Sequence, residues 1–142
     1  MIRILAQTCL VSFVLTLNSC SQTPYDNDLI SDGKGLNLTM STKRGVKGGN
    51  GIVYFVQNDG LTLTAYNGSK IKWIVNVVNP CKVAALEKSA ILGLYLVNDH
   101  ISLALGKGNY ARVDIQDGKT KYRCAGKNNS AFVPHQQTHN CR

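Results

Sequence analysis

Residues 51–77, GIVYFVQNDGLTLTAYNGSKIKWIVNV, decide the fold class. Apolar residues alternate with others or cluster as β-branched and aromatic side chains in three short runs: 52–56, 61–65 and 71–77. Such runs are typical of strands. Two turn signals separate them, Asn58-Asp59-Gly60 and Asn67-Gly68, and Asn-Gly favours a tight hairpin. The stretch therefore predicts a meander of three antiparallel strands.

A second meander is expected further along the chain. Its predicted strands are residues 94–97, 101–105, 110–115 and 119–124. Glycine-containing or Asn-Asp turns separate these strands. Between the meanders, Asn79-Pro80 resembles a helix start, and residues 83–90 favour helix by propensity. We therefore expect one short helix there.

Together these elements predict a mostly β protein with one modest core. The expected architecture is a small antiparallel sandwich or partly open barrel of two meanders, with one short helix. Alternation in the third strand places Trp73 on the apolar face with Ile71, Val75 and Val77, so we expect its indole ring to pack in the core.

The N-terminal sequence is typical of a secretory leader. Arg3 precedes an apolar stretch over residues 4–17, which is too short to span the roughly 30 Å of a bilayer interior. The four residues Leu17-Asn18-Ser19-Cys20 that close it resemble the lipobox of bacterial lipoproteins. The resemblance implies that residues 1–19 are a signal peptide, and that Cys20 becomes an acylated N-terminus carrying chains such as palmitate.

The same resemblance implies a location. In the lipoprotein family an Asp after the cysteine retains the protein at the inner membrane, and Ser21 stands there instead. We therefore expect a lipid-anchored protein of the bacterial outer membrane. Residues 20–50 are polar and glycine-rich, and we interpret them as the acylated N-terminus and a flexible tether. Within them Leu36-x-Leu38-x-Met40 alternates and is a candidate edge strand. The β domain is then expected over residues 51–126, followed by a polar tail over residues 127–142.

The charge of the chain indicates which kinds of partner we expect. The 142 residues carry a formal charge of +8, from 16 Lys and Arg against eight Asp and Glu. The expected partners are the membrane, through the acyl chains, and an envelope protein complex or an anionic envelope component. No run of Lys and Arg is dense enough to indicate a specific nucleic acid.

Three cysteines remain after the leader is removed: Cys81, Cys124 and Cys141. An oxidising compartment favours a disulfide, and three thiols allow one bridge in three ways. A bridge from Cys124 to Cys141 would pin the polar tail, whereas one from Cys124 to Cys81 would join the two halves of the domain. We favour a bridge that involves Cys124 and leave its partner open.

The tail also supports an alternative function. His135 and His139 are spaced to share a helix face, and Cys141 follows two residues later. Imidazole and thiolate together suit zinc or copper. A disulfide between Cys124 and Cys141 would remove both thiolates, so we rank metal binding second.

One further resemblance bears on the fold alone. Gly51-x-Val53-Tyr54, Asp59-Gly60, Leu63-x-Ala65-Tyr66-x-Gly68 and Trp73 resemble one blade of the repeat found in pyrroloquinoline-quinone-type β-propellers. A propeller needs at least about four such blades, and this chain is too short. The resemblance therefore implies a meander and no quinone site.

No catalytic constellation is visible in the sequence. Ser residues lack a nucleophile motif, and Asp99 and His100, the one adjacent acid–base pair, would point to opposite faces of a strand. We therefore predict a non-enzymatic binding, accessory or structural lipoprotein of the cell envelope without a cofactor, with zinc or copper handling as the alternative.

Overall fold

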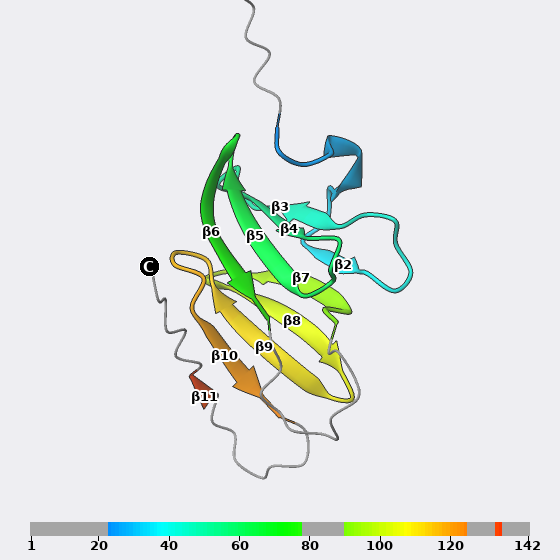
Figure 1. The fold of residues 1–142 in the computed structure, drawn as a ribbon, viewed down its shortest axis with the longest axis vertical. Helices are drawn as coiled ribbons and strands as arrows, with labels where there is room; N and C mark the ends of the chain where they lie inside the picture. Colours follow the sequence, from blue (N-terminus) through cyan, green and yellow to red (C-terminus); the bar gives the residue numbers. More distant parts are fainter. Residues whose placement is uncertain (1–22, 78–89, 125–132, 135–142) are drawn as a thin grey trace, which may run out of the picture.

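The computed structural model describes residues 23–77 and 90–124, together with the backbone of residues 133–134. These residues form two β-sheets packed face to face (Figure 1). Sheet A has the order β1-β3-β4-β5-β6, and sheet B has the order β11-β10-β9-β8-β7-β2. No strand pairing within these ranges joins the two sheets, so the fold is a sandwich and is not closed into a barrel.

Both predicted meanders are confirmed. In sheet A the predicted three-strand meander is β4 (Val53–Val56), β5 (Thr62–Asn67) and β6 (Lys70–Asn76), and β3 (Gly45–Lys47) pairs beside β4. In sheet B the second meander is β7 (Gly93–Val97), β8 (His100–Gly106), β9 (Asn109–Asp114) and β10 (Thr120–Arg123). All sequential pairs are antiparallel, and the β5–β6 hairpin turns at Gly68, whose φ of +60° suits the Asn-Gly signal.

The described part of the expected tether belongs to the fold. A 3₁₀ turn, η1 (Asn27–Leu29), is followed by β1 (Ile30–Ser31), which pairs in parallel with β3. The chain then crosses to sheet B, where β2 (Gly35–Asn37) forms the edge strand beside β7, before it returns to sheet A as β3. The folded body therefore begins well before residue 51. The alternation of Leu36, Leu38 and Met40 indicates the edge strand β2, whereas β1 and β3 are too short to show a readable alternation.

Two other expectations fall partly outside the described residues. The predicted helix over residues 83–90 lies there except for Ala90, which is not helical. The expected polar tail contributes β11 (Val133–Pro134), which pairs antiparallel with β10. Within the residues described, no helix is long and apolar enough to cross a bilayer.

The core fills the space between the sheets. Inward side chains of both meanders form one buried cluster, which includes Tyr54, Leu63 and Val75 from sheet A and Leu94, Leu103, Val113 and Tyr122 from sheet B. Burial raises the pKa of Tyr122 to about 12.

A smaller cluster lies on the outer face of sheet A. There Tyr25 packs over Phe55 and Tyr66, with ring centroids 6.1 and 5.0 Å away. Strand β4 is therefore buried on both faces, which explains why its sequence, VYFV, shows no polar alternation.

Trp73 joins the two sheets. Its Nε1 donates a hydrogen bond to the carbonyl oxygen of Ile115 at 3.1 Å, and its ring lies 5.9 Å from that of Tyr54. The indole also rests on the β9–β10 turn, where a Cβ added at Gly118 would lie 3.0 Å from Trp73 Cδ2. The prediction that Trp73 packs in the core is confirmed, because only 8% of its surface is exposed.

The prediction that Ile71 shares this face is wrong. The pairing of β5 with β6 shifts between Ala65 and Tyr66, so that Lys72 is an extra residue, a β-bulge, and Ile71 faces outward opposite Tyr66. Ile71 is 55% exposed as a result. One inserted residue reverses the faces of all residues before it in the strand.

We predict that neighbouring substitutions in β6 have very different effects. Trp73→Ala should lower the free energy of unfolding by about 3–5 kcal/mol, because it removes a large buried side chain. Ile74→Ala changes an outward-facing residue and should stay within about 0.5 kcal/mol of wild type. Chemical denaturation measures both values. Equal losses, or a fluorescence maximum of folded Trp73 typical of water, would contradict this placement.

Candidate functional site

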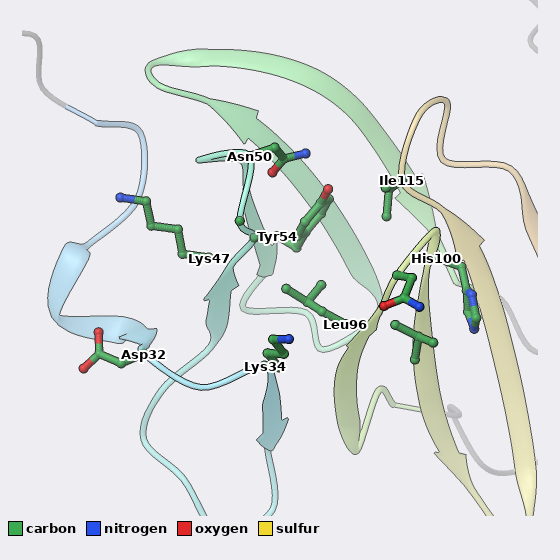
Figure 2. A pocket seen from close by; sticks show the side chains of 12 residues that line it. Asp32, Lys34, Lys47, Asn50, Tyr54, Leu96, His100 and Ile115 are labelled. Carbon is green, nitrogen blue, oxygen red and sulfur yellow. The ribbon is translucent and has the colours of Figure 1, made fainter.

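A pocket of about 590 Å³ lies where the two sheets separate at one end of the sandwich (Figure 2). Its walls come from the β1–β2 connection, the β3–β4 loop, the β7–β8 hairpin and the chain just after β9. These segments lie far apart in sequence, and the crossing of the N-terminal chain between the sheets brings the first of them to this end. The volume is within the usual range of about 300–1,000 Å³ for small-molecule sites.

The interior of the pocket is mostly apolar. Tyr54 from β4, Leu96 from β7 and Ile115 after β9 approach one another there (Figure 2). Burial raises the pKa of the Tyr54 phenol, and a hydrogen bond with the Asn50 side chain opposes that shift only in part. Tyr54 is therefore neutral at physiological pH, and its hydroxyl can donate or accept a hydrogen bond.

The β3–β4 loop shapes the rim beside Tyr54. The Asn50 side-chain oxygen accepts a hydrogen bond from the Ile52 backbone at 3.1 Å, and the backbone of Gly51 donates to Gly48 at 3.0 Å. A Cβ at Gly48 would lie 2.8 Å from the Asn50 side-chain oxygen and 3.3 Å from the Tyr54 ring. Glycine at position 48 therefore allows the loop to close onto the ring.

The charged side chains around the pocket give it a positive balance. Lys34 and Lys47 line it together with one acid, Asp32. Among the described residues neither lysine makes an ion pair. Unpaired ammonium groups beside an apolar interior suit a ligand that carries an anionic group.

His100 lines the far side and belongs to a charged cluster. Its Nδ1 lies 2.7 Å from an oxygen of Asp99, and Arg112 donates to the other oxygen of Asp99 at 2.9 Å. The expectation that Asp99 and His100 point apart is therefore wrong. Alternation holds within a strand, whereas Asp99 lies in the β7–β8 turn and folds back toward the first residue of β8.

Most site residues predicted from the sequence lie outside the described residues. These are the lipidation site Cys20, the cysteines Cys81 and Cys141, and the histidines His135 and His139. The zinc or copper site therefore stays a prediction. Cys124 follows β10 directly, and its predicted bridge to Cys81 or Cys141 also stays a prediction. Within residues 23–77 and 90–124, no group of three or more His, Cys, Asp or Glu side chains could hold a metal ion.

The pocket itself was not predicted from the sequence. Its residues come from four separate segments, and Lys34 and Lys47 fall in the stretch interpreted as a tether. The available signal was weak: a glycine-rich loop, 45–51, directly before a strong strand.

Comparisons of the chain with protein-family models, with curated proteins and with solved structures found no match. Function is therefore inferred from the geometry and chemistry of the chain's own residues.

We predict a pH effect at the charged cluster. The hydrogen bond from His100, and to a lesser degree the charge of Arg112, lower the pKa of Asp99 below its usual value. A lowered folded-state pKa contributes stability above the unfolded value of about 3.9, and that stability is lost as pH falls through the folded pKa. His100→Ala should return the Asp99 titration, followed by carboxyl ¹³C NMR, toward its ordinary midpoint. An ordinary midpoint in the wild-type protein would contradict the arrangement.

Proposed function

We propose that this chain is a lipid-anchored, non-enzymatic binding protein of the bacterial outer membrane, and that its end pocket binds an anionic envelope component. The observation that carries the proposal is the pair Lys34 and Lys47 beside an apolar interior that contains the neutral phenol of Tyr54. The anchor rests on the lipobox at Cys20, and the sorting to the outer membrane rests on Ser21.

The pocket favours a ligand with two kinds of surface. A phosphate or carboxylate group at the rim would be attracted by the two ammonium groups. An apolar or ring-shaped part would replace water against Leu96 and Ile115, while the Tyr54 hydroxyl and the Asn50 amide offer hydrogen bonds. Phospholipid headgroups and acidic sugar derivatives both have this chemistry.

The position of Tyr25 limits the distance between the folded body and an anchor at Cys20. Tyr25 packs onto Phe55 and Tyr66, and five peptide units separate it from Cys20. A fully extended chain of that length reaches roughly 18 Å. An acylated Cys20 would therefore hold the outer face of sheet A close to the membrane surface, whereas a tether of thirty residues would have held it clear.

The oxidising envelope also favours a disulfide at Cys124. Because Cys124 directly follows β10, a bridge there would either pin the polar tail to sheet B or join the two halves of the domain. We propose Cys141 or Cys81 as its partner.

The anchor predicts the behaviour of a single variant. Wild-type protein should incorporate labelled palmitate and partition into the detergent phase, because two or three acyl chains bind a membrane durably. Cys20→Ala should lose both properties, whereas Cys124→Ala, a matched cysteine change, should keep them. Processing and detergent partitioning of the Cys20→Ala protein as in wild type would refute the lipoprotein assignment.

The pocket predicts a charge-dependent affinity. In NMR titrations with glycerol 3-phosphate and with N-acetylmuramic acid, at least one should shift the Tyr54 and Leu96 signals saturably. The double variant Lys34→Ala/Lys47→Ala should weaken that binding about tenfold or more, which corresponds to about 1.4 kcal/mol.

Lys70→Ala, an exposed lysine of β6 outside the pocket, is the matched control and should bind as wild type does. Uniform effects of all lysine changes, or no saturable shift at Tyr54 with either compound, would contradict the proposed site.

A further inference from the structure

The outer face of sheet B carries two exposed tyrosines that the core does not use. Tyr95 on β7 is 45% exposed and Tyr110 on β9 is 47% exposed. The register places them in adjacent rows across the sheet. One row is Gly35, Tyr95, Ser102, Arg112 and Lys121, and the next is Asn37, Gly93, Ala104, Tyr110 and Arg123.

Two glycines fix the position of the Tyr95 ring. A Cβ at Gly35 would lie 2.6 Å from Tyr95 Cδ1, and a Cβ at Gly93 would lie 3.1 Å from Tyr95 Cε2. Any side chain at Gly35 would thus displace the ring. The phenol therefore lies against the backbone of β2 and β7, and almost half of its surface remains in solvent. An aromatic ring held in this way loses little conformational entropy when a ligand packs on it.

Only small residues separate this ring from Tyr110. Gly93, which Tyr95 covers, is paired with Ala104, and Ala104 is paired with Tyr110. Two strand spacings amount to roughly 10 Å, so the backbone positions of Gly93 and Tyr110 stand about that far apart, with only the methyl group of Ala104 between them. Ser102 lies in the neighbouring row and adds a hydroxyl.

The charge beside the tyrosines is positive. Arg123 is the cross-strand partner of Tyr110, and Lys121 stands in the row of Tyr95. Arg112 lies between Ser102 and Lys121 in the same row but is engaged by Asp99. Neither Lys121 nor Arg123 makes an ion pair with another described residue. The two cations are therefore available to an anionic partner.

We propose that the outer face of sheet B is a binding surface for an acidic polysaccharide. Sugar rings would pack their C–H faces on Tyr95 and Tyr110, a packing that suits flat aromatic faces. Their hydroxyl groups would hydrogen-bond with the phenols and Ser102, and their carboxylate or sulfate groups would meet Lys121 and Arg123. This surface is separate from the end pocket, and the proposal does not depend on what the pocket binds.

Single-stranded nucleic acid is the other polymer that stacks on aromatic rings, but it normally requires a basic track that follows every phosphate. Two unpaired cations at one side of the rings do not form such a track. Hydroxyl-rich sugars also match the phenol and serine groups between the charges. The proposed location in the cell envelope also favours a polysaccharide over a nucleic acid. Binding of soluble sugars does not require the anchor, so it tests the surface independently of that location.

Titration calorimetry of the purified full chain, with detergent present throughout, tests the proposal. The probes are hexagalacturonate, a heparin hexasaccharide, neutral maltohexaose and a thymidine hexanucleotide. At least one acidic hexasaccharide should bind, and it should bind more tightly than maltohexaose and the hexanucleotide. Tyr110→Ala should weaken that binding about tenfold or more, since a ring contact worth about 1.4 kcal/mol corresponds to a factor of ten.

Further variants separate stacking from charge and from folding. Tyr95→Phe keeps the ring and should bind nearly as wild type does. Gly35→Ala keeps Tyr95 but displaces its ring, and should weaken binding several-fold. Lys121→Ala/Arg123→Ala should weaken the acidic probes and leave maltohexaose unchanged. Ile71→Ala, which alters an exposed residue on the outer face of sheet A, should have no effect.

Three outcomes would overturn the proposal. The first is no binding of either acidic hexasaccharide at millimolar concentration. The second is tighter binding of the hexanucleotide than of any sugar, which would assign the surface to nucleic acid. The third is acidic-sugar binding that Tyr110→Ala leaves intact while Lys34→Ala/Lys47→Ala abolishes it, which would assign the sugar to the pocket.

Discussion

The burial of two inner sheet faces against each other is the constraint on which the rest of the structure depends. Trp73 joins the two sheets at the β9–β10 turn, because its ring packs on Tyr54 and on Gly118 while its Nε1 donates a hydrogen bond to the Ile115 carbonyl oxygen. Where the contact ends, Tyr54 and Ile115 present their other sides to the pocket. The packing that stabilises the fold therefore also positions Tyr54 and Ile115 at the candidate site.

How much the sequence predicts follows from the length of each pattern. The strands β4 to β10 carry either alternation or a β-branched and aromatic run over four to seven residues, and turn chemistry marks their ends, so both meanders were predictable. Ile71 was misplaced because a β-bulge at Lys72 leaves no sequence signal and reverses the face of the residues before it. The alternation of Leu36, Leu38 and Met40 indicates the edge strand β2, whereas β1 and β3 are not predictable because two or three residues define no period. Asp99 and His100 meet because a turn residue does not obey strand alternation.

The candidate site was harder to predict than the fold because it is built from non-local neighbours. Lys34, Lys47, Tyr54 and Leu96 converge only after β2 joins sheet B and β3 returns to sheet A. Because of the same crossing, the outer faces of sheet A and sheet B differ. The segment from Tyr25 covers sheet A, and the flat Tyr95 ring depends on Gly35 of β2. With an anchor at Cys20, sheet A would face the membrane and sheet B would face away from it.

The central claim is that residues 27–47 are part of the sandwich, since these residues complete both sheets, the pocket and the support of Tyr95. Amide hydrogen exchange of the full chain tests it most directly. The account predicts that the amides of Leu36 and Val46 exchange slowly, with protection approaching that of Val56 and Leu103 in the core, because all four are buried in one cluster. Exchange of residues 27–47 at the rate of an unfolded chain, beside a protected remainder, would contradict it.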